Sequence, residues 1–228
     1  MRHKFVLFDI DQTLLYSGGA GFKAMNLALE DLTGVADGFR GISFAGNTDP
    51  LIFREALSIH GLDCDDGMLE RLTRGYLGHL PRLLQESAAV LKPGVPKILE
   101  EIRTMERVYL GLLTGNVEEG ARLKLGRFNL NGFFPIGAFA SDHEDRNELL
   151  PIAVERLRNF CGISVAYADC VVVGDSPKDV ECARVHGARS IAVATGRYSV
   201  AELEDTSADL VLPDLSVTGR IVEWIGAF

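Results

Sequence analysis

The sequence predicts an α/β fold, a Rossmann-like parallel sheet with helices on both faces and a small all-helical unit inserted after the first strand. Short apolar runs alternate with helical patterns of ten or more residues, which is typical of right-handed βαβ units. A stretch from about residue 15 to residue 91 breaks this alternation, because it holds helical patterns with no convincing strand between them. We therefore expect residues 1–15 and 91–228 to form the α/β core. Residues 16–90 are expected to form the inserted unit, the cap.

The strands of the core are predicted by continuous apolar runs bounded by polar residues, a pattern that suits strands buried on both faces. These runs are residues 5–8, 107–113, 170–175, 190–195 and 208–213. Helical patterns lie between them at residues 95–105, 117–128, 148–160 and 177–187. The last of these has Pro177 in its first turn and Gly187 at its end, the usual asymmetry of helix punctuation.

Three helices are predicted in the cap, at residues 20–34, 49–61 and 67–87. The first two patterns end in glycine, a common helix C-terminus. Residues 18–22 are glycine-rich but lack the spacing of a P-loop, which favours a hinge or tight turn. Leu27, Ile52 and Leu57 fall on apolar helix faces and are expected in the core of the cap.

The composition is that of an ordinary globular protein, with 47% hydrophobic and 24% charged residues. A net charge of −9 argues against a nucleic-acid partner, which needs a basic face. The 4 cysteines are scattered, without a CxxC or a histidine at metal-ligand spacing, so neither zinc nor a disulfide framework is expected. No apolar segment approaches the roughly 20 residues of a membrane span, and the first apolar run is too short for a signal peptide. We therefore expect a cytoplasmic protein with no membrane partner; the oligomeric state is left open.

Polar residues follow three of the predicted strands, where ligands bind in an open parallel sheet. They are Asp9, Asp11, Thr114, Asn116, Asp175 and Asp179. Carboxylates without histidine or cysteine suit Mg²⁺. A carboxylate beside the metal can attack phosphorus, and a second acid can protonate the leaving oxygen. Any one of these residues alone could instead be a helix cap.

Three segments together resemble motifs I, II and IV of the haloacid dehalogenase-like (HAD) hydrolase superfamily. They are DIDQTLL, LLTGN and VVVGDSPKD, in that order and each after an apolar strand. The insertion after the first motif is similar to the helical cap of one HAD subclass. The resemblance implies a Rossmann-like core and Mg²⁺-dependent phosphoryl transfer through an aspartyl-phosphate.

The resemblance also implies a role for each matched residue. Asp9 would be the nucleophile and a Mg²⁺ ligand, and Asp11 the general acid/base that also gives its backbone carbonyl to the metal. Thr114 would bind the transferring phosphoryl group, with Gly115 and Asn116 beside it at the substrate. Asp175 would ligate Mg²⁺, and Asp179 would support the metal site directly or through water.

One position departs from the family pattern. The superfamily usually supplies a lysine before its fourth motif, and this sequence has Arg146 there. Arginine neutralises phosphate through a planar fork, so it is not a simple substitute for lysine. We assign the lysine's role to Arg146. The alternative is a surface arginine paired with Asp142, Glu144 or Asp145.

In the cap, Asn47 and Thr48 are the expected substrate contacts, although they could instead cap the helix that starts at Asp49. The resemblance favours a phosphoglycolate phosphatase-like enzyme acting on a small phosphorylated metabolite. A β-phosphoglucomutase-like phosphomutase shares the same core motifs. A 2-haloacid dehalogenase is disfavoured by Asp11, because expelling a halide needs no acid. A non-catalytic binding module is the remaining alternative.

Overall fold

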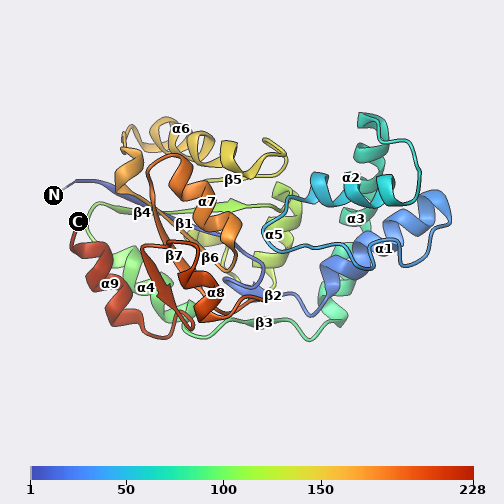
Figure 1. Cartoon of the computed structure of the whole chain (residues 1–228). Coiled ribbons are helices and arrows are strands. Elements are labelled where there is room, and N and C mark those ends of the chain that lie inside the picture. Colours follow the sequence, from blue (N-terminus) through green and yellow to red (C-terminus); the bar gives the residue numbers. More distant parts are fainter. Residues whose placement is uncertain (1) are drawn as a thin grey trace.

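The computed structural model describes residues 2–228 and contains a six-stranded parallel sheet that forms the centre of the core (Figure 1). The strand order is β5-β4-β1-β6-β7-β8. The strands are β1 (Lys4–Phe8), β4 (Val108–Thr114), β5 (Gly137–Phe139), β6 (Cys170–Gly174), β7 (Arg189–Val193) and β8 (Leu210–Leu212). The predicted Rossmann-like α/β fold class is confirmed.

Helices cover both faces of this sheet. Successive side chains of a strand point to opposite faces, so each buried strand has apolar side chains on both. In β1, Val6 and Phe8 pack into one apolar cluster while Phe5 and Leu7 pack into another. The first cluster is covered by α4 (Val95–Thr104), α5 (Glu118–Gly126) and α9 (Thr218–Gly226). The second is covered by α6 (Leu149–Cys161) and α7 (Pro177–Val185), and the short helix α8 (Val200–Glu204) packs near the β8 edge.

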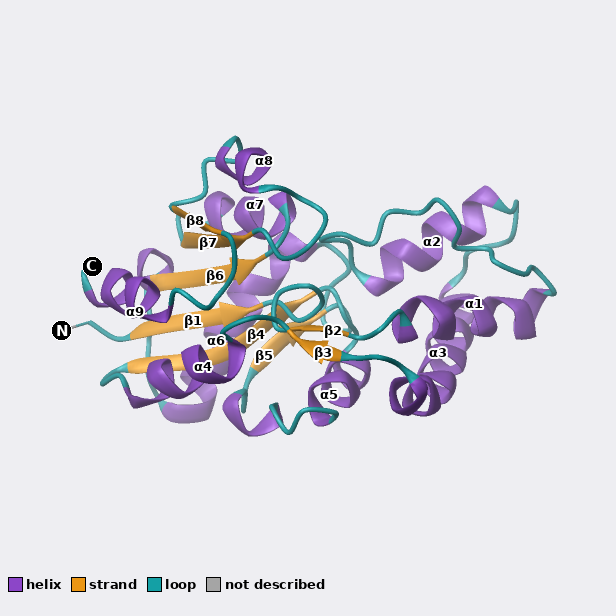
Figure 2. Ribbon diagram, turned by 90° about the horizontal axis from the view of Figure 1, so that it is seen from below, coloured by secondary structure: helices purple, strands orange, loops and turns teal. Residues whose placement is uncertain are grey.

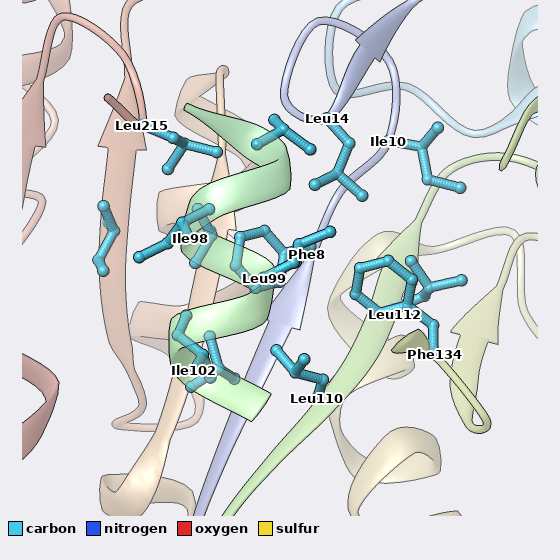
Figure 3. Close-up of a cluster of buried hydrophobic side chains, with 14 of the residues drawn as sticks. Phe8, Ile10, Leu14, Ile98, Leu99, Ile102, Leu110, Leu112, Phe134 and Leu215 are labelled. Atoms are coloured by element: carbon cyan, nitrogen blue, oxygen red, sulfur yellow. The ribbon is translucent and has the colours of Figure 1, made fainter. Parts of the chain in front are cut away.

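The larger cluster fixes the strand ends that carry the polar residues. Figure 3 shows Ile98, Leu99 and Ile102 of α4 lying over Phe8 and Leu110 of the sheet. Each fully buried aliphatic or aromatic side chain of this kind contributes roughly 1.5–3 kcal/mol to folding. The packing of α4 against Phe8 therefore fixes the position of the carboxyl end of β1.

Three helices between β1 and β4 lie apart from the sheet (Figure 2), and their buried side chains form a separate apolar cluster. They are α1 (Ala20–Thr33), α2 (Asp49–Ile59) and α3 (Asp66–Glu86). Two short strands, β2 (Leu15–Tyr16) and β3 (Val90–Leu91), pair antiparallel where the chain leaves and returns. We propose that residues 16–90 form the cap and that residues 2–15 and 91–228 form the core; residue 1 of the predicted core lies outside the described residues.

Several elements were absent from the sequence prediction, among them β2, β3, β5, α8 and α9. The first three have only two or three residues, too few to show an alternating or continuous apolar pattern. Within residues 2–228, no helix is both long enough and apolar enough to cross a membrane.

Candidate active site

A cavity of about 570 Å³ lies between the carboxyl ends of the central strands and the cap. Strand β1 has β4 on one side and β6 on the other, so the strand order reverses at this point. Ligands of doubly wound sheets bind at such a switch point. The core side of the cavity includes Asp9, Asp11, Asn116, Lys124, Arg146 and Asp175.

Asp9 directly follows β1 and is only 7% exposed. Its backbone N–H donates to the carbonyl of Val173 at 2.9 Å, which ties it to β6. Burial raises the pKa of Asp9 to about 6, against the opposing charge of Arg146, and the neighbouring Asp179 and Asp11 raise it further. A hydrogen bond with the hydroxyl of Thr114 favours the ionised form. Asp9 is thus a buried carboxylate that needs positive charge beside it.

Arg146 supplies part of that charge. It begins a short 3₁₀-helix, is buried, and places its Nη2 3.1 Å from Oδ1 of Asp9. The same nitrogen donates to Asp179 and to the carbonyl of Leu113. Two of the acids that were alternative partners for Arg146 form ion pairs with other arginines. Asp142 pairs with Arg156 at 2.6 Å, and Glu144 pairs with Arg54 at 2.8 Å. Arg146 therefore lies against Asp9, and its role in place of the family's lysine stays a prediction.

Asp175 and Asp179 complete a cluster of buried acids. One carboxylate oxygen from each of Asp9, Asp175 and Asp179 lies within 4.8 Å of the others. Burial, together with the charges of Asp179 and Asp9, raises the pKa of Asp175 to about 8. Asp179 is already engaged, because its carboxylate accepts from Ser176 in a capping box at the start of α7 and from Arg146. Asp9 and Asp175 are the two acids of this cluster best placed to bind a cation directly.

The cluster fits a hard divalent cation. Its donors are carboxylate oxygens, the ligands that Mg²⁺ prefers. Without such an ion the ionised forms of Asp9 and Asp175 are disfavoured, as their raised pKa values show. A divalent charge would reverse that penalty.

Asp11 lies in a hydrogen-bonded group with a lysine that the sequence reasoning missed. The Nζ of Lys124 is 2.5 Å from Oδ2 of Asp11 and 2.6 Å from Oδ1 of Asn116, and the Nδ2 of Asn116 donates to Asp11 at 2.9 Å. Burial alone would lower the pKa of Lys124, but the carboxylates of Asp11 and Asp49 outweigh it and the pKa is raised. Lys124 is therefore a buried ammonium, while the side chain of Asp11 stays 39% exposed toward the cavity.

Thr114 is fully buried at the end of β4, with its hydroxyl accepting from the Nδ2 of Asn116 at 2.9 Å. Thr114 thus connects Asp9 to the group formed by Asn116, Lys124 and Asp11. Gly115, the next residue, lines the cavity directly. Thr114, the last residue of β4, therefore contacts Asp9, and the two residues after it line the same cavity as Asp9.

The cap closes the cavity through the segment that precedes α2. The backbone N–H of Asp49 donates to the carbonyl of Gly115 at 2.7 Å, and a Cβ on Gly115 would lie 2.1 Å from the carbonyl oxygen of Asn47. The Asp49 carboxylate accepts from the backbone N–H of Val117 at 2.9 Å. Burial raises the pKa of Asp49 to about 6, against the charge of Lys124 and the Val117 hydrogen bond. Glycine at residue 115 is required for this close approach of cap and core.

The two predicted substrate contacts of the cap differ in their surroundings. Asn47 lines the cavity and its Oδ1 accepts from Lys178. Thr48 is not among the lining residues; its hydroxyl donates to the carbonyl of Glu144 at 2.8 Å, so it joins the cap to the core. Its side-chain oxygen caps no helix N–H, although Thr48 occupies the N-cap position of α2. The structure places Asn47 at the cavity and Thr48 at the cap–core junction.

A signal for Lys124 and Asp49 exists in the sequence, although it is weak. Lys124 shares the buried face of α5 with Gly120, Ala121 and Leu125. A charged residue on the apolar face of a helix needs a buried partner. Asp49 stands in the first turn of α2, where an acid is ordinary.

Comparisons with known proteins agree with this architecture. A HAD-hydrolase-like family model matches residues 147–218. A phosphoglycolate phosphatase of Rhodospirillum rubrum is 28% identical over 230 residues, covering 98% of this chain and 91% of that protein. A phosphoglycolate phosphatase of Pseudomonas savastanoi pv. phaseolicola is 26% identical, and the match covers 93% of this chain and 77% of that protein.

Solved structures share the fold over nearly the whole chain. CbbY from Rhodobacter sphaeroides in complex with phosphate has a TM-score of 0.76 and 19% identity, covering 95% of this chain and 96% of that one. A hydrolase from Pseudomonas syringae has a TM-score of 0.72 and 23% identity, covering 98% and 99%. The family match, the strand-end motifs and the curated relatives thus make the chain similar to HAD-like hydrolases, and the solved structures show the shared fold.

Proposed function

We propose that the protein is a Mg²⁺-dependent phosphatase that hydrolyses a small-molecule phosphate monoester through an aspartyl-phosphate on Asp9. The observation that carries this proposal is the buried Asp9 carboxylate between Arg146 and the acids Asp175 and Asp179. The curated relatives, which are phosphoglycolate phosphatases, support phosphate monoesters as the substrate class. The cytoplasmic location stays a prediction from the sequence.

The metal would be held by Asp9 and Asp175, with the backbone carbonyl of Asp11 and with Asp179 directly or through water. When bound, the ion would neutralise the phosphate oxygens and stabilise the ionised forms of the acids. Asp179 already holds Arg146 and caps α7, so its first contribution is to orient these groups.

In the proposed reaction an oxygen of Asp9 attacks phosphorus, and the ester bond to the leaving alcohol breaks. Asp11 gives a proton to the departing oxygen. Asp11 then takes a proton from water as that water attacks phosphorus, which releases inorganic phosphate and restores Asp9. Arg146 and Thr114 contact Asp9, which supports the proposal that they bind the transferring phosphoryl oxygens.

The position of the cap supports a small substrate and a site shielded from bulk water. The Asn47–Asp49 segment lies directly on Gly115 and Val117. A closed lid of this kind excludes water and completes the site around the substrate.

The direct test is release of inorganic phosphate from a panel of phosphate monoesters with and without Mg²⁺. We expect Mg²⁺-dependent release that disappears in Asp9→Asn. A phosphomutase would instead return the phosphoryl group to a sugar and release little phosphate. Chloride release from 2-haloacids without Mg²⁺, or an Asp9→Asn variant with full activity, would contradict the proposal.

A further inference from the structure

One part of the cap side of the cavity is apolar, although Ser17, Ser43, Asn47 and Asp49 of the cap also line the cavity. The side chains of the apolar part include Phe22, Met25, Ile42, Phe44 and Ile52, named here the apolar wall. Met25, Ile42 and Ile52 are almost fully buried, whereas Phe22 is 41% exposed. A large aromatic side chain left open to a cavity is an unsatisfied apolar surface, which a ligand can cover.

The apolar wall is fixed by the aromatic residues behind it. The rings of Phe22 and Phe44 have centroids 5.6 Å apart, and Phe44 lies edge-on to the fully buried Phe39 at 6.2 Å. Phe39 in turn packs on Phe53 at 6.0 Å. Such ring pairs stabilise their arrangement beyond simple burial. The wall is therefore a preformed surface.

The charges around the cavity are concentrated at the phosphate end. Within residues 2–228, the lining cations are Lys124, Arg146 and Arg197, and all three belong to the proposed core. Lys124 forms an ion pair with Asp11, and Arg146 forms ion pairs with Asp9 and Asp179. The charged residue that the cap itself adds to the lining is Asp49, an acid that would repel an anionic leaving group.

Arg197 is the remaining cation that a second anionic group could reach. Its side chain is exposed, its Nη1 donates to the hydroxyl of Ser43 at 3.1 Å, and its guanidinium lies 5.2 Å from the ring centre of Tyr198. Arg197 thus bridges core and cap and leaves the apolar wall uncharged. A leaving-group carboxylate that faces the apolar wall, away from Arg197, would lose hydration without a charged partner.

The cavity volume agrees with a leaving group larger than glycolate. About 570 Å³ lies within the roughly 300–1,000 Å³ of pockets that hold drug-sized ligands. From the wall, the charges and the volume we infer that the substrate is a phosphate monoester whose leaving group carries an uncharged alkyl or aryl portion against Phe22 and Phe44. This inference rests on the proposed phosphatase function and narrows its substrate class.

The test of the apolar wall compares two phosphonates of equal length and branching in calorimetric titrations with Mg²⁺ present. One is phosphonopropionate, the analogue of phosphoglycolate; the other is isoamyl phosphonate, in which an isopropyl group replaces the carboxylate. We expect isoamyl phosphonate to bind at least about tenfold more tightly. Tighter binding of phosphonopropionate, equal binding, or no binding of either would overturn the inference.

A homologous series measures the same surface during turnover. We expect kcat/KM for methyl, ethyl, propyl and butyl phosphate to rise about fourfold per methylene, because burying one methylene contributes about 0.8 kcal/mol. Phe22→Ala should flatten this dependence. Phe160→Ala, a matched change at an exposed phenylalanine of α6 outside the cavity, should leave it unchanged. A flat wild-type series, or the same slope in Phe22→Ala, would overturn the inference.

The two measurements separate the two proposals. If isoamyl phosphonate binds more tightly but no ester is hydrolysed, the phosphatase function fails and the apolar specificity stands. If esters are hydrolysed but phosphoglycolate is the preferred substrate, and Arg197→Met lowers kcat/KM for phosphoglycolate, the phosphatase function stands and the apolar specificity is wrong.

Discussion

The core side of the cavity presents several charged groups held by ion pairs, whereas the cap side adds one charged residue, Asp49, and an apolar wall packed on the aromatic rings behind it. In the core, Asp9 follows the end of β1 and Arg146 begins a short helix. The two side chains form an ion pair with each other. Phe22 and Phe44 of the cap contact other aromatic rings instead. Under the proposed function, the reaction type would be set by the core and the substrate choice by the cap.

The largest expected effect on the charged side comes from Asp9→Asn. Replacing the attacking carboxylate by an amide removes the nucleophile, so we expect kcat to fall by roughly 10⁴-fold or more. Phosphate release measures the loss, and Asp63→Asn at an exposed position of the cap is the matched control. Equal turnover of Asp9→Asn and wild type would contradict Asp9 as the nucleophile.

Arg146→Met should lower kcat by about 10²–10³-fold, because a preorganised cation beside the reacting phosphoryl group is lost. It should also lower the free energy of unfolding by about 3–5 kcal/mol, since the buried Asp9 and Asp179 would lack their partner. Kinetics and urea unfolding check the two effects separately. Arg146→Lys should recover part of the rate; recovery of the full rate would show that the arginine fork has no special part.

Lys124→Met is expected to lower kcat by about 10–10²-fold with a smaller change in KM. Asp11 would lose its ammonium partner at 2.5 Å and Asn116 would lose a donor, so the acid/base group would be less well positioned. Lys97→Met, at an exposed lysine of α4 outside the cavity, is the control. A pure KM effect would move Lys124 from positioning Asp11 to binding substrate.

The smallest expected effect is on stability without metal. The pKa of Asp175 is about 8 and that of Asp9 about 6 in the folded chain, above the usual 3.8 of aspartate. The unfolded chain loses these protons first as pH rises, so the metal-free protein should lose stability between about pH 4 and pH 8. Mg²⁺ should therefore raise Tm by several degrees more at pH 8 than at pH 6, measured by thermal melting with and without chelator. A pH-independent Mg²⁺ effect would contradict a metal bound by these two acids.

The strand-end residues were predictable from the sequence because a parallel sheet places the carboxyl ends of its strands at one edge. Asp9, Thr114 and Asp175 were identified in this way, and all three lie there. Arg146 required the family resemblance, since its sequence neighbours alone suggest a surface arginine.

Residues on helices were harder to place. The pairing of Lys124 with Asp11 depends on how α5 packs against the core, which no short sequence pattern fixes. Ile52 was expected only as cap core, and it is buried there, yet it also lines the cavity. Which face of a cap helix meets the substrate follows from tertiary packing, so the apolar wall emerged only from the structure.

The most direct test of the central claim is to trap the phosphorylated carboxylate. A phosphate monoester, rapid quenching and borohydride reduction should convert a phosphorylated aspartate into homoserine, which mass spectrometry of the peptide containing FVLFDIDQTLL would place at residue 9. We expect homoserine at residue 9 in the wild type when Mg²⁺ is present, and none in the absence of substrate. Active wild-type enzyme that yields homoserine at residue 11 or at another carboxylate would contradict Asp9 as the nucleophile.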